Sequence, residues 1–79
     1  MATFMVKLAD GSEMLLTAGR ATRTDDGDVT FEDVDDRGKW SPTCTLKSHR
    51  LDSVHVRRIA EDGQARWVKQ SDAGHWQAY

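Results

Sequence analysis

Cysteine is almost absent from this chain of 79 residues, because Cys44 is the only one. A single cysteine cannot form an internal disulfide, so the disulfide framework of small secreted domains is excluded. Long hydrophobic runs are missing too: the longest aliphatic run is residues 14–16, whereas a membrane-spanning helix needs about 20 residues. The first residues also lack the basic and apolar segments of a secretory signal. These absences predict a cytoplasmic protein.

Asparagine is absent as well, isoleucine occurs once, and four lysines stand against seven arginines. Asparagine, isoleucine and lysine have AT-rich codons. The bias is therefore typical of a GC-rich genome, such as that of a high-GC bacterium or one of its phages.

The length supports a single small β domain over residues 1–79, because too few residues remain for a second hydrophobic core. The net charge of −2 is unevenly distributed. Residues 1–36 carry nine acidic and three basic residues, whereas residues 37–79 carry eight basic and four acidic ones. The fold can separate these halves into oppositely charged surfaces, or interleave them in hairpins where the charges solvate one another.

Apolar and polar residues alternate along most of the chain, which is the pattern of half-buried β-strands. Phe4 and Val6, for example, fall on one face and Met5 on the other. Gly19 interrupts an apolar stretch and predicts a bulge or bend. Strands are expected at residues 3–8, 13–23, 29–32, 40–46 and 65–70, with residues 74–79 as a final edge strand or a docked tail. Glycine-containing acidic segments indicate the turns between them.

The segment of residues 40–46 carries two marked features. Pro42 has no backbone N–H, so this strand is expected at a sheet edge, or it starts after the proline. Alternation places Trp40, Cys44 and Leu46 on one apolar face. We therefore interpret Cys44 as a buried structural thiol.

Residues 48–59 are ambiguous between helix and strand. Their apolar residues have near-helical spacing, which allows a short helix. Val54 and Val56, however, are β-branched and alternate with a polar residue. We prefer a turn or 3₁₀ segment at residues 47–52 and a strand at residues 53–60, and keep the short helix as the alternative.

Five or six short strands predict an all-β fold, a small antiparallel meander rolled into a barrel or half-barrel. A first strand, a turn at Asp10 and Gly11, a third strand centred on Phe31 and a Val-x-Val strand at residues 54–56 follow one another. This order is similar to that of small SH3-like and Sm-like barrels. The resemblance implies a fold and no particular activity.

Metal-binding patterns fail at specific positions. Residues 33–38 resemble the start of an EF-hand calcium loop, but Arg37 takes the third ligand position and Cys44 takes the place of the bidentate glutamate. A zinc site would have to use Cys44 with three histidines that lack the close spacing of paired ligands. We expect no metal and no cofactor.

A catalytic centre is not expected either. A reactive thiolate needs an electropositive, partly open site such as a helix N-terminus, and a strand interior around Cys44 supplies neither. The chain has no glycine-rich phosphate loop and little room for a deep pocket. We expect no catalytic residues and no enzyme activity.

Arginine and tryptophan gather in the C-terminal part of the chain. If residues 62–63 form a two-residue turn, Arg58 faces Trp67 and its guanidinium can lie across the indole ring. The other face would then carry a basic band of His55, Arg57 and Arg66. Strict alternation puts Arg58 on the apolar side of its strand, which requires either a bulge at residues 57–58 or a face that is only partly buried.

These residues form a candidate partner-binding surface, since arginine and tryptophan dominate interface hot spots. The candidate residues are Arg57, Arg58, Arg66, Trp67, Trp76 and Tyr79. The alternative is an ordinary surface hairpin with Trp67 as a hydrophobic plug, and terminal aromatic residues that dock on the core.

Two functions follow from these features. The first is a non-catalytic protein-interaction or adaptor module whose partner is another protein or a second copy in a homo-oligomer. The second is a small-barrel nucleic-acid-binding protein that contacts phosphates through Arg57, Arg58, Arg66 and Lys69 and stacks bases on its tryptophans. The net acidic charge weakens the second, because nucleic-acid affinity comes largely from neutralised phosphates. No membrane partner is expected.

Overall fold

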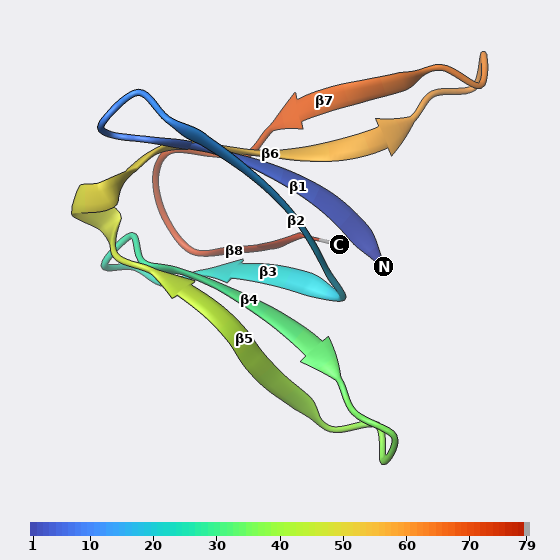
Figure 1. Cartoon of the computed structure of the whole chain (residues 1–79), viewed down its shortest axis with the longest axis horizontal. Helices are drawn as coiled ribbons and strands as arrows, with labels where there is room; N and C mark the ends of the chain where they lie inside the picture. Colours follow the sequence, from blue (N-terminus) through green and yellow to red (C-terminus); the bar gives the residue numbers. More distant parts are fainter. Residues whose placement is uncertain (79) are drawn as a thin grey trace.

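The computed structural model describes residues 1–78 and consists of β-strands and one 3₁₀ turn (Figure 1). The elements are β1 (Ala2–Leu8), β2 (Glu13–Ala18), β3 (Arg20–Arg23), β4 (Val29–Val34), β5 (Trp40–Leu46), η1 (Ser48–Arg50), β6 (Leu51–Ile59), β7 (Ala65–Lys69) and β8 (Trp76–Ala78). They form two four-stranded antiparallel sheets with the orders β2-β1-β6-β7 and β5-β4-β3-β8. The predicted all-β antiparallel class is confirmed.

The number of strands is higher than the predicted five or six. Gly19 divides one predicted strand into β2 and β3, which belong to different sheets, and the C-terminal segment adds β8. The preferred 3₁₀ turn and strand after residue 47 are present as η1 and β6, so the helical alternative is wrong. Pro42 lies on β5 at a sheet edge, as its missing N–H predicts.

The core lies between the two sheets. Phe4 of β1 meets Phe31 of β4 edge to face, with ring centroids 5.2 Å apart. The buried side chains are Phe4, Val6, Ala18, Ala21, Val29, Phe31, Leu46, Val54, Val56 and Ala78. Every strand except β7 contributes to this set. The two sheets are not closed on each other, so the SH3-like barrel is not confirmed.

Four hairpin turns share one construction. In each, the N–H of a glycine donates to the carbonyl three residues before it, and that same residue bonds through its own N–H to the carbonyl following the glycine. Gly63, with φ of 82°, is one of these glycines, and its left-handed conformation adds one residue to the turn as a bulge. The turns are residues 8–12, 24–28, 35–39 and 60–64.

Trp40 lies on the face opposite to the one predicted. The β4–β5 ladder slips by one residue, since Phe31 pairs with Cys44 but Glu32 pairs with Pro42. A one-residue slip reverses the face of every following side chain. Trp40 therefore leaves the core side, where Cys44 remains half-buried against the core, and packs over the bend at Gly19.

Trp40 explains why residue 19 is a glycine. A Cβ atom there would lie 2.6 Å from the indole ring of Trp40. The N–H of Gly19 bonds to the carbonyl of Glu32 at 2.9 Å and to the carboxylate of Asp33 at 2.7 Å. Arg20 lies over the same ring, 4.2 Å from its centroid, and its Nε is 3.0 Å from the carboxylate of Glu32. The bend joins the two sheets and anchors the β4–β5 hairpin to the body.

Candidate interaction surface

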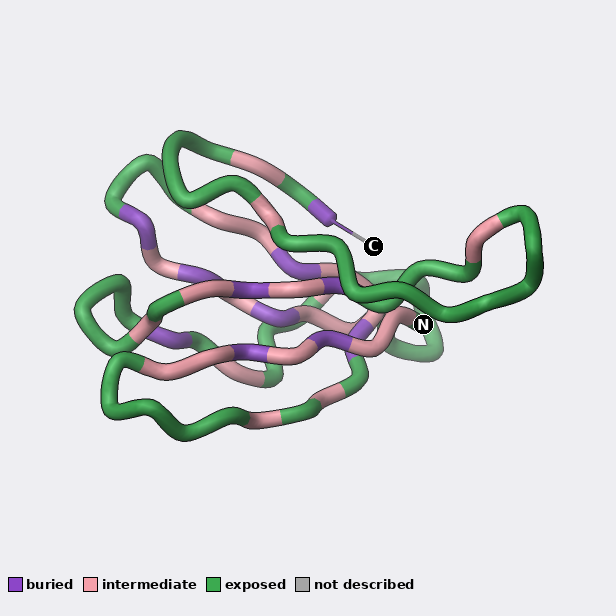
Figure 2. The backbone as a smooth tube through the Cα atoms, turned by 90° about the horizontal axis from the view of Figure 1, so that it is seen from above, coloured by how far each residue is buried: buried purple, intermediate pink, exposed green. Residues whose placement is uncertain are grey.

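Two hairpins extend beyond the core (Figure 1). We name residues 33–41 the β4–β5 arm and residues 57–69 the β6–β7 arm. Figure 2 shows the β6–β7 arm on the right, exposed along both strands, with the single half-buried residue Ala60 near its tip. The radius of gyration of 12.7 Å exceeds the roughly 11.6 Å typical of a compact domain of this length, as extended arms require.

The β6–β7 arm exposes an unusual amount of apolar surface. Ile59 is 65 % exposed, Trp67 is 42 % exposed and Val68 is 44 % exposed. Of the six large hydrophobic residues that are exposed among residues 1–78, three lie on this arm. The arm also carries four basic residues (Arg57, Arg58, Arg66 and Lys69) against two acidic ones, Glu61 and Asp62. Apolar and basic side chains are therefore combined on one projecting ribbon.

The register of this hairpin differs by one residue from the prediction. Arg57, rather than Arg58, lies opposite Trp67, and Arg58 lies opposite Arg66. The cause is one additional residue in the turn. The N–H of Ala60 donates to the carbonyl of Gln64, so residues 61–63 form the loop, whereas the prediction had only residues 62–63. The predicted pairing of Arg58 with Trp67 is wrong.

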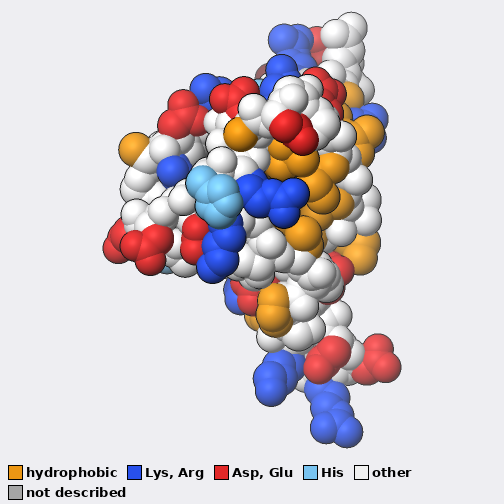
Figure 3. All heavy atoms as spheres, turned by 60° about the vertical axis from the view of Figure 1, so that its left-hand side comes forward, with side chains coloured by type: hydrophobic (Ala, Val, Ile, Leu, Met, Phe, Trp, Pro, Cys, Tyr) orange, Lys and Arg blue, Asp and Glu red, His pale blue; other side chains and the backbone are white. Residues whose placement is uncertain are grey.

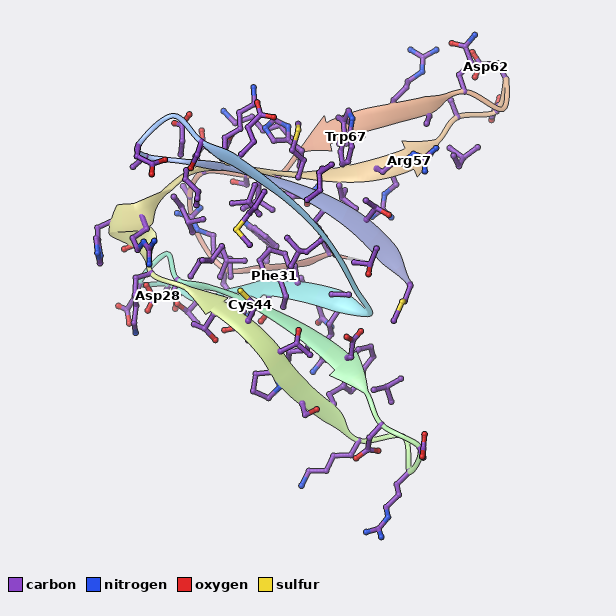
Figure 4. All side chains as sticks on the ribbon, viewed as in Figure 1. Asp28, Phe31, Cys44, Arg57, Asp62 and Trp67 are labelled. Atoms are coloured by element: carbon purple, nitrogen blue, oxygen red, sulfur yellow. The ribbon has the colours of Figure 1, made fainter. Side chains whose placement is uncertain are left out.

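The two faces of the arm follow from this register. Opposed residues of an antiparallel pair share a face, so Arg57 and Trp67 lie together on the outer face of the sheet (Figure 4). The outer face also carries His55, Ile59, Ala65 and Lys69. Arg58, Arg66 and Val68 lie on the core side. Val68 is opposite Val56, the last core residue of β6, and Arg58 and Arg66 lie beyond it. The predicted basic band is therefore redistributed, and no bulge interrupts the β6–β7 ladder.

Arg66 and Lys69 of the arm form ion pairs with acidic residues. Arg66 lies 3.2 Å from the carboxylate of Asp62 near the tip, and Lys69 lies 3.0 Å from that of Asp72. All four side chains are largely exposed, so each pair contributes little to stability. The pairs nevertheless reduce the positive charge that the arm presents to a polyanion.

His55 lies at the base of the outer face. Burial lowers the pKa of His55, and the positive charges of Lys7 and Lys69 on the neighbouring strands lower the pKa further. Its Nε2 is 2.9 Å from the hydroxyl of Ser53. His55 is therefore a neutral, polar residue between two lysines at neutral pH.

Trp76 lies away from the arm, on β8 of the other sheet. Its indole N–H donates to the carbonyl of Ser71 at 2.9 Å, and Arg23 donates to the same carbonyl at 3.0 Å. Trp76 packs against the core cluster. The structure therefore separates it from Arg57, Arg58, Arg66 and Trp67, and the predicted site residue Tyr79 lies outside the described residues.

A pocket of about 150 Å³ opens beside Trp76. Its charged lining mixes Arg23 with Asp52 and Asp72, and three serines supply the rest of the polar surface. The turn at residues 24–28 forms one wall and is held to η1 by Asp28, which accepts a hydrogen bond of 2.9 Å from the Ser48 N–H. That bond lowers the pKa of the Asp28 carboxyl. The pocket has room for one small polar group or side chain.

A second hollow lies between the β1–β2 turn and η1, with His49, Arg50 and Asp10 in its lining. Figure 3 shows the corresponding side of the molecule, where a histidine and Lys or Arg side chains adjoin a hydrophobic patch. Asp10 accepts hydrogen bonds from the side chain and backbone of Ser12, which lower the pKa of the Asp10 carboxyl. Both of these hydrogen bonds lie within the turn that contains Asp10.

Other kinds of site were not found in the part of the chain that the structure describes. No three His, Cys, Asp or Glu side chains among residues 1–78 gather as they would around a metal ion. Within the same residues, no helix has the length and hydrophobicity to cross a membrane. Comparisons with protein-family models, curated proteins and solved structures found no match.

The β6–β7 arm is therefore the best-defined candidate surface. The sequence singled out Arg57, Arg58, Arg66 and Trp67, which the structure brings together on one ribbon. Ile59 and Val68 were missed, because alternation alone assigns apolar strand residues to a core. The signal for Ile59 was the length of the hairpin, which continues past the last core residue of β6, Val56. Val68 lies opposite Val56, and its exposure follows from the edge position of β7, which the sequence does not mark.

Proposed function

We propose that this protein is a non-catalytic protein-interaction module and that the β6–β7 arm is its binding surface. The observation that carries the proposal is the exposure of Ile59, Trp67 and Val68 on a ribbon that also presents arginines. Ile59 and Trp67 share the outer face with Arg57, and exposed apolar side chains beside arginine are typical of interface centres. The proposed setting is the cytoplasm, and the proposed origin is a high-GC bacterium or phage.

The test compares two exposed apolar residues on the same sheet. Trp67→Ala removes the aromatic side chain of the arm, whereas Leu15→Ala removes an apolar side chain of β2 that is even more exposed. Either variant should fold. We expect Trp67→Ala to weaken every interaction of the protein at least about tenfold, measured by sedimentation or by capture of a purified partner. Equal binding by both variants would contradict the arm as the surface.

A second candidate is binding of single-stranded nucleic acid. It is favoured by Arg57 beside the exposed ring of Trp67, since base stacking on an aromatic ring next to cations is the usual arrangement of such sites. It is opposed by the ion pairs that occupy Arg66 and Lys69. Binding to a random oligonucleotide that is strong at low salt and falls steeply with added salt would favour this candidate over the first.

We also propose that the fold is related to small SH3-like barrels. In support, one continuous stretch of chain passes from the first sheet to the second at Gly19, as strands at the corners of small barrels do. Nuclear Overhauser contacts between Gly19 and Glu32 in solution would show that the corner is held as described and would support this classification, and their absence would contradict it.

A further inference from the structure

β7 is supported on one side only. It contributes no residue to the core, all five of its residues are exposed, and β6 is its one neighbour in the sheet. A two-stranded ribbon is marginally stable in water without further packing. The second edge of β7 therefore has no neighbouring strand among residues 1–78.

The edge of β7 has few of the features that keep edge strands from pairing. β5, an edge of the other sheet, carries Pro42 and a bulge, and β8 has only three residues. Proline, bulges, short length and charged side chains are the usual protections of an edge. The two charged residues of β7, Arg66 and Lys69, both have acidic partners. β7 has no proline and an unbroken ladder, and its two large apolar side chains, Trp67 and Val68, occupy adjacent positions. It is open to a further strand.

The backbone groups that β7 offers can be deduced from the hairpin. Gln70 donates to Val54 at one end of the ladder, and Ala60 bonds to Gln64 at the other. Hydrogen-bonded and non-hydrogen-bonded pairs alternate along an antiparallel ladder. Arg66 and Val68 therefore direct their N–H and C=O groups to β6. The groups that point to the free edge belong to Ala65, Trp67 and Lys69.

These three residues are symmetric about Trp67. In an antiparallel pairing of two β7 strands around a two-fold axis at Trp67, Trp67 meets its own copy and Ala65 meets Lys69. All outward groups of Ala65, Trp67 and Lys69 are then hydrogen-bonded. If the register shifts by one residue, backbone groups that point toward the second strand face groups that point away from it, and hydrogen bonds cannot form. Only registers shifted by two residues therefore remain as alternatives.

Charge distinguishes the remaining registers. With the axis at Trp67, Arg66 lies opposite Val68 of the second copy and Lys69 opposite Ala65, so no two cations are directly opposed. With the axis at Arg66, the two Arg66 side chains face each other, which destabilises a pair of strands. With the axis at Val68, Ala65 lies opposite Ser71, beyond the end of β7. The register centred on Trp67 alone pairs the full strand without a charge clash.

The same register also continues the outer face of the sheet. Arg57 lies beside Trp67 in one copy, and the two Trp67 rings meet at the axis, so the row becomes Arg–Trp–Trp–Arg across four strands. Aromatic pairs and arginine beside an aromatic ring both favour association. The pairing places the two exposed Trp67 side chains side by side at the axis.

We propose that a second copy of this chain binds through the free edge of β7, antiparallel and with the two-fold axis at Trp67. The proposal rests on the arm being the interaction surface. One strand pair forms an interface smaller than that of a standard complex, so the dimer dissociates with a constant on the order of micromolar or weaker. Association is therefore visible only at high protein concentration.

Disulfide trapping reads the register directly. In a Cys44→Ala background, Arg66→Cys and Val68→Cys chains are oxidised separately and as a mixture. The facing pairs in all three registers are non-hydrogen-bonded, with Cα atoms about 4.5 Å apart, within the range of a disulfide. The axis at Trp67 predicts a cross-link between the two different chains, several-fold in excess over either self-linked product. Self-linked Arg66→Cys or Val68→Cys as the main product would overturn this register.

A second variant separates loss of pairing from loss of folding. Ala65→Pro removes an N–H that points to the free edge, a position where a sheet tolerates proline. We expect a folded monomer by sedimentation at concentrations where the unmodified chain dimerises. A dimer that persists in Ala65→Pro would overturn the pairing through β7. If the unmodified chain is a monomer at millimolar concentration while Trp67→Ala still abolishes binding of another protein, the dimer is refuted and the interaction module stands.

Discussion

The two arms of this small domain have the same kind of turn, but their tryptophans lie in different surroundings. The β4–β5 arm is joined to the body by the packing of Trp40 on Gly19 and by its contact with Arg20. The β6–β7 arm places its tryptophan, Trp67, on an exposed face opposite Arg57. One tryptophan stabilises the bend between the sheets, and the other is exposed and belongs to the surface that we propose for a partner. Residue type alone therefore does not assign a function, and the strand register decides it.

The largest difference should appear when each tryptophan is removed. Trp40→Ala leaves a space over the bend and should lower the free energy of unfolding by about 2 kcal/mol, because Trp40 is half-buried. Trp67→Ala should lower it by less than about 1 kcal/mol at dilutions where the chain is a monomer. Chemical denaturation measures both values. Equal losses would show that the two arms do not differ in this way.

The bend offers the next effect. Gly19→Ala adds a Cβ atom 2.6 Å from Trp40, so the ring must shift. We expect a loss of about 1–2 kcal/mol in the free energy of unfolding, as in other overpacked sites. The double variant Gly19→Ala with Trp40→Ala should lose less than the sum of the two single variants, since the clash is gone. Additive losses would mean that the glycine serves a different purpose.

Arg20 contributes less. Its guanidinium lies on Trp40, and its Nε is 3.0 Å from Glu32 in a partly buried pair. Arg20→Ala should lower the free energy of unfolding by about 1 kcal/mol. The matched change on the other arm, Arg57→Ala, should have no measurable effect on the monomer. A larger loss for Arg57→Ala would reverse the comparison.

The smallest effect concerns acid stability at the base of the β6–β7 arm. The pKa of His55 is lowered in the folded chain by burial and by Lys7 and Lys69, and is raised in part by Glu13 and Asp52. Between this lowered pKa and about pH 6.5, the unfolded chain binds more protons than the folded chain. The contribution of His55 to the free energy of unfolding is therefore fully present above about pH 6.5 and declines as the pH falls below it. His55→Gln should remove this part of the decline in denaturation curves between pH 7 and 5. An unchanged slope would argue against the shift.

Much of the fold was predictable, because alternation marks strands and acidic glycine segments mark turns. The strands, the 3₁₀ turn, the bend at Gly19 and the edge position of Pro42 all follow from local rules. The face of Trp40 and the partner of Trp67 did not. Each of these two features depends on one additional residue, in the β4–β5 ladder or in the β6–β7 turn. Such a residue changes the face or the cross-strand partner of every residue after it.

The candidate surface was predictable in part for the same reason. Arg57, Arg58, Arg66 and Trp67 were recognised by residue type, and their arrangement required the register. Trp76 could not be separated from them without the topology, which places β8 beside β3. The sequence also did not decide whether its acidic and basic halves would mix on the surface. The two arms still differ in charge, since acidic residues outnumber basic ones by three to two on the β4–β5 arm.

Amide hydrogen exchange at two protein concentrations tests the central claim most directly. The N–H groups of Ala65, Trp67 and Lys69 point to the free edge, whereas those of Arg66 and Val68 already bond to β6. On raising the concentration from micromolar to millimolar, exchange at Ala65, Trp67 and Lys69 should slow at least about tenfold, with little change at Arg66 and Val68. Exchange that stays fast and independent of concentration at all three outward positions would contradict the pairing of β7.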